Sequence, residues 1–283
     1  MRHSSNGKDR TETPVLRPES FDSVSDFYDT YRTPHPKEVV DDVIASAHLT
    51  TDSRVLEIGC GTGQLSVPLA RHGVNLMAVE LGPHLAARAQ QNLRQFPNAR
   101  VEASSFEDWP LPHQKFDAVV AASAFHWLDP NTRFTKVARA LSQGGFLTIL
   151  HVHHVRGGTQ DFWKETQPYY IKWGLSDDPA FQPTTPEGAP AMYPELDHNP
   201  DFSSVERHRF EIPKKYSTRS YMGWLNTDSL VLGLDPESRR EFLRDIEQLI
   251  DSNHHGGITR NYVYEVVVAQ RGSLVTQSLG ASP

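Results

Sequence analysis

The sequence predicts an α/β protein whose core is a doubly wound, mostly parallel β-sheet. Residues 55–63 read V-L-E-I-G-C-G-T-G, an apolar strand pattern that ends in a glycine turn, and an apolar-periodic stretch follows at 64–71. This order is typical of a buried parallel strand, a ligand-binding loop and the start of a helix. Strand and helix patterns then alternate as far as residue 152, and such alternation builds right-handed crossovers and a doubly wound sheet.

Each element of this core follows from its local pattern. A first helix over 37–47 places Val39, Val40 and Val43 on one face. The run 116–121 is apolar after its aspartate, which indicates a central strand. Strands are expected at 54–58, 75–80, 99–103, 116–121 and 146–152, and helices at 64–71, 83–96 and 132–141.

The pattern changes after residue 155. Prolines cluster between Pro179 and Pro200, which predicts irregular structure there. Residues 204–212 alternate as in an antiparallel strand, and the pattern of 262–269 predicts the last strand. Helices are expected at 217–225 and 236–252. The expected organisation is a disordered tail (1–20), a core with an N-terminal cap segment (21–154), an inserted substrate lid (155–257), the last core strand (258–272) and a tail (273–283).

Composition excludes several classes of partner. The formal net charge of −7 argues against nucleic acid, because no basic field attracts phosphates. The single cysteine, Cys60, allows no intrachain disulfide and suits a reducing cytoplasm. No apolar run approaches the about 18 residues that span a membrane, and the N-terminus has no signal-peptide pattern. We therefore expect a cytoplasmic protein with no membrane partner, and the oligomeric state stays open.

The glycine turn and two acids indicate the kind of ligand. Gly59 and Gly61 let backbone N–H groups approach a ligand that a side chain would push away. The spacing is G-x-G-x-G, not the G-x-G-x-x-G of dinucleotide sites, and Glu57 in the strand would repel a phosphate. Glu80 ends the next strand about 20 positions after Gly59, where an acid can accept hydrogen bonds from a ribose.

Four sequence blocks follow one another: 55–63, 74–80, S-F-E-D-W-P at 105–110, and F-D-A-V-V-A-A-S-A-F-H-W-L-D-P at 116–130. In this order they resemble the class I S-adenosylmethionine-dependent methyltransferases, in particular the small-molecule branch with the ubiquinone/menaquinone and trans-aconitate enzymes. The similarity covers about residues 27–151. It implies a seven-stranded Rossmann-like sheet with an antiparallel last strand and an inserted, mainly helical lid, S-adenosylmethionine as cofactor, and a small-molecule acceptor. The region after residue 155 is rich in tryptophan and tyrosine, which suits a partly apolar or aromatic acceptor.

The resemblance also implies roles for single residues. Glu57 and the glycines would face the methionine portion of the cofactor, Glu80 would hold the ribose, and Leu81 would pack on the adenine. The expected cofactor contacts are Tyr31, Arg32, Glu57, Gly59, Gly61, Gln64, Leu65, Glu80, Leu81, Ser105, Phe106, Ala122, Ser123 and Phe125.

Methyl transfer from a sulfonium needs an in-line acceptor and little covalent work by the protein. A hydroxyl acceptor would gain from a general base, and His126, His153 and Tyr31 are the candidates. Whether a base is used stays open, because His126 can equally shape the pocket. No metal is expected: His151 and His153 share a strand face, His154 points away, and a site needs at least three converging ligands.

Two other functions remain as alternatives. A nicotinamide-dependent oxidoreductase would use the same fold, but the glycine spacing and Glu57 disfavour it. A SAM-binding partner subunit without catalysis would need no enclosed pocket. The acceptor atom is not determined by the sequence.

Overall fold

The computed structural model describes residues 18–159 and 161–272. The predicted C-terminal tail and residues 1–17 of the predicted N-terminal tail lie outside the described residues. Residues 18–20 begin a short 3-10 helix, η1 (Pro18–Val24), which continues into α1 (Ser25–Tyr31). The cap segment, residues 21–36, therefore enters the structure as a short helical pair.

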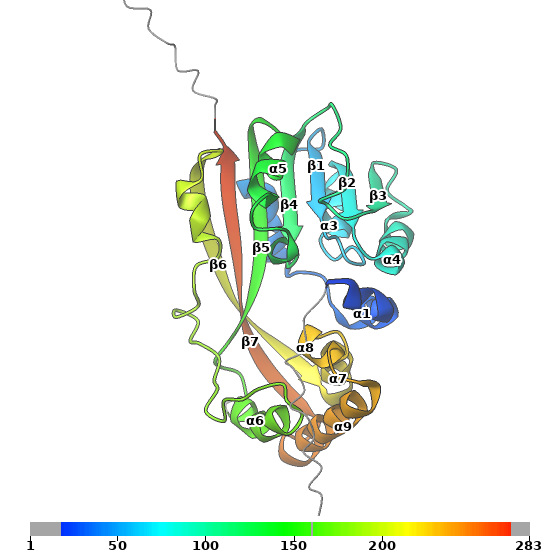
Figure 1. The fold of residues 1–283 in the computed structure, drawn as a ribbon, viewed down its shortest axis with the longest axis vertical. Coiled ribbons are helices and arrows are strands. Elements are labelled where there is room, and N and C mark those ends of the chain that lie inside the picture. The colour runs from blue at the N-terminus through cyan, green and yellow to red at the C-terminus, as the bar shows by residue number, and fades with distance from the viewer. Residues whose placement is uncertain (1–17, 160, 273–283) are drawn as a thin grey trace, which may run out of the picture.

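One sheet of seven strands organises the described residues (Figure 1). Its order is β3-β2-β1-β4-β5-β7-β6; β3, β2, β1, β4 and β5 run parallel, and β7 is antiparallel to both β5 and β6. The predicted doubly wound fold with an antiparallel last strand is confirmed. The strands are β1 (Arg54–Ile58), β2 (Asn75–Glu80), β3 (Ala99–Ala103), β4 (Phe116–Ala122), β5 (Leu141–Val155), β6 (Phe202–Ser217) and β7 (Gly257–Arg271).

Helices cover both faces of the parallel part of the sheet. On β1, Leu56 and Ile58 face the layer that includes α5, whereas Val55 faces the layer with α2 and α3. Alternating residues therefore supply two apolar cores, as expected for strands buried on both sides. The core helices are α2 (Lys37–Ser46), α3 (Ser66–His72), α4 (Pro83–Leu93), α5 (Arg133–Ala140) and the 3-10 helix η2 (Phe125–Trp127).

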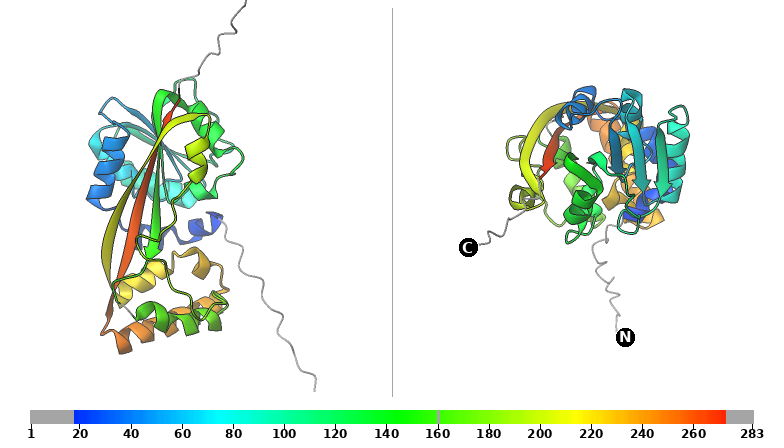
Figure 2. Two further views of the ribbon diagram at one scale, coloured as in Figure 1. Left: turned by 90° about the vertical axis from the view of Figure 1, so that its left-hand side faces the viewer. Right: turned by 90° about the horizontal axis from the view of Figure 1, so that it is seen from above.

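A helical lobe surrounds the outer halves of the three longest strands (Figures 1 and 2). β5, β6 and β7 have 15, 16 and 15 residues, so they continue past the core and twist into this lobe. The lobe helices are α6 (Phe162–Lys172), α7 (Thr218–Leu225), α8 (Ser229–Leu232) and α9 (Pro236–Asn253). Their apolar faces pack into a third core with the outer part of β7.

The long strands exceed their predicted ranges because cross-strand pairing continues where the apolar alternation stops. β6 pairs with β7 from Phe202 opposite Arg271 to Ser217 opposite Gly257, through the polar run that contains Pro213. A proline is tolerated there because β6 is the edge strand of the sheet.

The sequence pattern does not predict α6 or α8. Pro168 lies inside α6, and a proline normally ends a helix because it removes a backbone donor. Burial offsets this cost: Phe162 is fully buried in the lobe core, and Tyr170 packs edge-on against Phe242 of α9. The proline-rich stretch also contains a short 3-10 helix, η3 (Pro194–His198), rather than only irregular structure.

The lobe and the core face each other across the carboxyl ends of the parallel strands. In Figure 1 these ends point towards α7 and α8, and α1 lies between the core and the lobe. No helix of the described ranges is both long and apolar enough to cross a lipid bilayer.

Phe242→Ala tests the packing of the lobe. Phe242 is 0% exposed, so its truncation should lower the free energy of unfolding by about 3–5 kcal/mol, from lost burial and a residual cavity. Urea denaturation of the full chain measures the effect. Phe181→Ala, at a 46% exposed ring, is the matched control and should change stability by less than about 1 kcal/mol. Equal effects of the two variants would contradict the assigned lobe core.

Candidate functional site

A cavity of about 620 Å³ opens at the carboxyl edge of the parallel strands. Its volume lies within the about 300–1,000 Å³ of small-molecule sites, and its position is where doubly wound sheets bind ligands. The walls come from the glycine turn (residues 59–63), the ends of β2, β4 and β5, the cap segment, and the lobe.

The glycine turn has a conformation that only glycine adopts without strain. Gly59 and Gly61 have φ values of +66° and +57°, in the left-handed region. A Cβ atom at Gly59 would lie 2.5 Å from the Cβ of Ala124, and one at Gly61 would lie 3.2 Å from Cε1 of Tyr28. The turn therefore presents bare backbone to the cavity.

Two buried acids stand beside this turn. Glu80 accepts the N–H of Gly82 at Oε1 (2.9 Å) and that of Gly61 at Oε2 (2.8 Å). Glu57 Oε2 accepts the Oγ–H of Ser66 at 2.6 Å. Burial raises the pKa of Glu57 to about 8, against the hydrogen bond from Ser66 and with help from the charge of Glu80. Burial also raises the pKa of Glu80, and its amide donors oppose that shift.

The backbone after β4 is strained at Ser123. Its φ of +52° is unusual for a residue with a side chain, and such outliers cluster at functional sites. The N–H of Ser123 donates to the carbonyl of Leu150 on β5 (2.8 Å), which holds this turn. Ser123 and the next residues of the chain thereby form one wall of the cavity.

Two histidines meet on the same side of the cavity. The rings of His126 and His151 are 6.0 Å apart, and the His126 ring lies 4.9 Å from that of Trp127. Desolvation lowers the pKa of His126, and the charge of Arg133 lowers it further. Burial lowers the pKa of His151 to about 4. Both imidazoles are therefore neutral at neutral pH, and the buried Nδ1 of His151 has no hydrogen-bond partner among residues 18–159 and 161–272.

Thirteen of the residues expected from the sequence line the cavity. They are Arg32, Glu57, Gly59, Gly61, Gln64, Leu65, Glu80, Leu81, Ser105, Phe106, Ala122, Ser123 and His126.

Three expected residues are not brought to the cavity. The ring of Tyr31 packs against Gly223 of α7 and stacks on Phe27, with ring centroids 6.0 Å apart. Phe125 is 0% exposed in the sheet core, where it contacts Phe134 and other rings. The third residue is His153, whose Nε2 lies 3.1 Å from Oε2 of Glu265.

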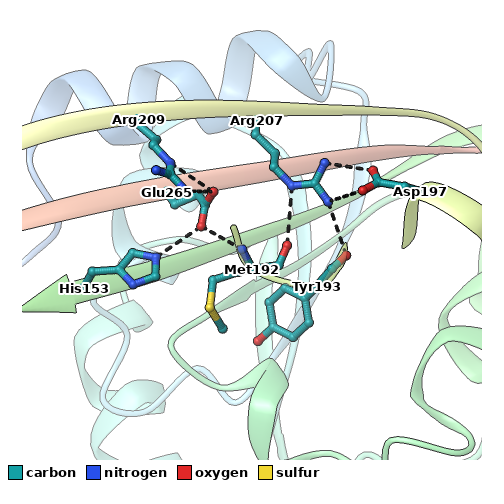
Figure 3. Close-up of polar contacts among 7 residues, drawn as sticks. All are labelled: His153, Met192, Tyr193, Asp197, Arg207, Arg209 and Glu265. Carbon is teal, nitrogen blue, oxygen red and sulfur yellow. Dashed lines mark hydrogen bonds and ion pairs between the residues drawn. The ribbon is translucent and has the colours of Figure 1, made fainter. Parts of the chain in front are cut away.

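The contacts of His153 belong to a polar cluster that joins β5, β6, β7 and the segment before β6 (Figure 3). Glu265 is fully buried, and its carboxylate also accepts from the guanidinium of Arg209 and from the N–H of Met192. Burial opposes its ionisation, but these hydrogen bonds hold the pKa of Glu265 below its usual value. Arg207 donates to the carbonyl of Met192 and to Asp197, so the cluster ties the segment before β6 to the sheet.

The cap segment is fixed to the lobe by Arg32. Its Nε and Nη2 donate to Oγ1 and the carbonyl of Thr227, both at 2.8 Å. The guanidinium lies over the rings of Tyr28 and Trp224, 5.4 Å from each centroid. This clamp closes one side of the cavity.

Sequence reasoning missed the cavity residues that the lobe supplies. An aromatic enrichment of the later region marks the lobe as a whole, but no motif singles out these positions. The residues are Lys214 and Tyr216 of β6, Trp224 of α7, Asp228 and Ser229 at the start of α8, and Tyr262 and Tyr264 of β7.

Two further features of the described ranges bear on chemistry. Cys60 is buried in the turn, and burial raises the pKa of its thiol, so a reactive thiolate is not favoured. Within residues 18–159 and 161–272, no group of three or more His, Cys, Asp or Glu side chains is placed to hold a metal ion.

Glu57 should make the stability of the ligand-free protein depend on pH. Its pKa is higher in the folded state, about 8, than in the unfolded chain, so the folded state binds more protons between about pH 4.5 and 8. Stability should therefore fall as pH rises through this window, by up to about 1.4 kcal/mol per unit. Glu57→Gln should remove this dependence in urea titrations between pH 5 and 9.

The matched control for this prediction is Glu247→Gln, on the exposed side of α9, which should keep the wild-type pH profile. Parallel profiles for wild type and Glu57→Gln would show that Glu57 ionises in the folded protein as it does in the unfolded chain.

Comparison with known proteins agrees with this geometry. A family model described as a methyltransferase domain matches residues 55–145. The chain is 33% identical over 131 residues to an uncharacterised methyltransferase of Mycobacterium tuberculosis, covering 46% of this chain and 51% of the relative. It is 34% identical over 106 residues to a malonyl-[acyl-carrier protein] O-methyltransferase of Paenibacillus sp., covering 35% and 38%. The matches thus span about half or less of each of these two relatives.

A solved structure extends the likeness in fold to nearly the whole chain. The SAM-dependent methyltransferase from Geobacter sulfurreducens, solved with S-adenosylhomocysteine, superposes with a TM-score of 0.52 at 14% identity, covering 92% of this chain and all of that one. At this identity the likeness shows the fold alone. Residues 55–145 therefore match a methyltransferase domain, and the sheet order and the glycine turn of the structure agree with that match.

Proposed function

We propose that the protein is an enzyme that transfers the methyl group of S-adenosylmethionine to a small-molecule acceptor. The observation that carries this proposal is that the glycine turn, Glu57 and Glu80 all face one cavity at the carboxyl edge of the sheet. The lobe covers that cavity with aromatic side chains, which suits a partly apolar acceptor.

In the proposed cofactor site, Glu80 accepts hydrogen bonds from the ribose hydroxyls. Each of its oxygens already accepts one backbone N–H, which orients the carboxylate and leaves further lone pairs for the ligand. Glu57 acts on the ammonium of the methionine portion, directly or through water. A positive charge beside Glu57 would lower its raised pKa and so stabilise its ionised form.

The other proposed cofactor contacts surround these two acids. Leu81 packs against the adenine, and Ser105 and Phe106 form the wall beside it. Tyr31 and Phe125 receive no cofactor role, because their rings pack elsewhere. The remaining contacts are Arg32, Gly59, Gly61, Gln64, Leu65, Ala122 and Ser123.

In the proposed reaction the acceptor atom forms a bond to the methyl carbon while the carbon–sulfur bond breaks. The electron pair of that bond stays on sulfur and gives a neutral thioether. The enzyme's share is to hold the two reactants in line and to exclude water, and such positioning can supply about 7–11 kcal/mol of the barrier. An acceptor hydroxyl must also lose its proton.

We assign that proton to His126. It lines the cavity, and its lowered pKa leaves the imidazole neutral and able to accept a proton at neutral pH. His153 receives no catalytic role, because its Nε2 already pairs with the buried Glu265.

Glu80→Ala tests the cofactor site. Loss of the carboxylate leaves ribose hydroxyls unpaired and should weaken S-adenosylhomocysteine binding by about 1–3 kcal/mol, measured by calorimetry. Gly61→Val should abolish binding, because a side chain there clashes with Tyr28 and strains the left-handed turn. The exposed Glu247→Ala is the control. Normal binding in both site variants, or a wild type that binds NADH instead, would refute the proposed site.

His126→Gln tests the base. With labelled S-adenosylmethionine and a panel of phenols, carboxylic acids and amines, the wild type should label at least one acceptor. For a hydroxyl acceptor, the variant should lose about 10²–10⁴-fold in kcat and keep its affinity for S-adenosylhomocysteine. The wild-type kcat should be constant through neutral pH and fall only in acid, as His126 becomes protonated, because burial and the charge of Arg133 lower the pKa of its imidazole.

The matched control for the base is His255→Gln, at an exposed turn, which should keep wild-type kcat. An unchanged kcat in His126→Gln would show that His126 is not the base and only shapes the cavity. A wild type that binds the cofactor and labels nothing in the panel would contradict the assigned activity.

A further inference from the structure

The cavity has acidic side chains at one end and basic side chains at the other. Glu57 and Glu80 lie where β1 and β2 end, whereas the end beside the lobe is lined by Arg32, His154 and Lys214. We call this second group the basic end. In the proposed function Glu80 binds the ribose of the cofactor and Glu57 acts on its ammonium group. The proposed function assigns no ligand group to Lys214 or His154.

Lys214 is a cation without an anionic partner. Its Nζ donates to Oγ1 of Thr33 at 2.7 Å and lies 4.9 Å from the centroid of the Tyr216 ring. Within the described ranges no carboxylate forms an ion pair with it. Burial lowers the pKa of Lys214 to about 8, and the neighbouring Arg32 contributes to this shift. An anion placed beside Nζ would restore the stability of the charged form.

Arg260 lies next to the basic end, where it contacts His154. It is only 2% exposed, its guanidinium lies 3.4 Å from the centroid of Trp163, and no carboxylate of the described residues pairs with it. Its Nη2 donates to Nδ1 of His154 (3.2 Å), so Nδ1 carries no proton. Burial and the charge of Arg260 lower the pKa of His154 far enough to keep the ring neutral. The proton of His154 therefore resides on Nε2, which has no partner among the described residues.

Among the described residues one acid, Asp228, faces the basic end. Its single carboxylate does not balance the positive charge of the arginines and of Lys214. Asp228 accepts the N–H of Leu230 (3.0 Å) at the start of α8. Burial raises its pKa, while Arg32 opposes that shift. Three guanidinium and ammonium groups thus share this region with a single carboxylate. Unpaired buried charges are costly, which makes the region receptive to an anion.

We propose that the basic end binds a carboxylate carried by the acceptor, so that the substrate class is apolar or aromatic carboxylic acids. The carboxylate would accept from Nζ of Lys214 and from Nε2–H of His154. The apolar body would pack against aromatic walls such as Tyr216 and Tyr264. This inference rests on the proposed function, because it places the acceptor in the same cavity as the cofactor.

The basic end could instead bind the carboxylate of the cofactor's methionine portion. The following test separates an acceptor carboxylate from a cofactor carboxylate. Phenylacetate, 3-phenylpropanoate and octanoate, each beside its uncharged amide, are titrated calorimetrically into the full chain with and without saturating S-adenosylhomocysteine. At least one acid should bind the wild type ten times or more tightly than its amide. In Lys214→Met that acid should bind no better than the amide, and the affinity for S-adenosylhomocysteine should stay within twofold.

Lys215→Met is the matched control, because the neighbouring side chain points to the other face of β6 and is exposed. It should keep the wild-type preference for the acid, and unchanged melting curves of both variants should show that each is folded. Acids that bind no better than amides in the wild type would overturn the proposal. A tenfold loss of S-adenosylhomocysteine affinity in Lys214→Met, without loss of the acid preference, would assign the basic end to the cofactor.

Failure of the proposed function gives a different result. In that case the wild type would not bind S-adenosylhomocysteine at all. The titrations without it would still show whether the basic end prefers an acid to its amide.

Discussion

The hydrogen bond from the Gly61 N–H to Glu80 is the interaction on which the site depends. It joins the turn after β1 to the end of β2, and it forms only because Gly61 has a left-handed backbone. The same geometry aims the carboxylate of Glu80 and keeps the turn free of side chains beside Tyr28. One backbone conformation therefore positions both an acid and an open surface at the edge of the sheet.

Glu57 and Lys214 line the cavity, and neither forms an ion pair within the described residues. Glu57 and Lys214 are displaced towards their neutral forms, each mainly by burial. Such groups reduce the stability of the empty protein, and a ligand of opposite charge would offset their desolvation. By contrast, the equally buried Glu265 is surrounded by donors and stays ionised. The difference separates an acid that maintains the fold from an acid that is available to a ligand.

The lobe is an extension of the core and not a separate unit. β5 and β7 run without interruption from the parallel sheet into the lobe, where α6 and α9 pack around them. Two arginines on one face of β6, Arg207 and Arg209, fix the segment before that strand, one through Asp197 and one through Glu265. The lobe side of the cavity is thus built on strands that also belong to the core sheet.

The sequence alone determined the parallel core and most of the residues at the proposed cofactor side of the cavity. Strand and helix periods, the glycine spacing and the acid at the end of the second strand are local signals, because each depends on neighbours in the chain. Most cofactor contacts expected from the resemblance accordingly line the cavity, from Glu57 to Ser123. Tyr31 and Phe125 do not, because ring packing against Gly223 and Phe134 decided their orientation.

The proposed acceptor side was decided only by the tertiary structure. Strand register between β6 and β7 brings Lys214 to the cavity, and no local pattern fixes such a register. Distant partners also decide which nitrogen atoms of the β5 histidines are available to a ligand. Glu265 pairs with Nε2 of His153, and Arg260 donates to Nδ1 of His154. Long-range pairing of polar groups leaves no period in the sequence, whereas burial of a strand or helix face does.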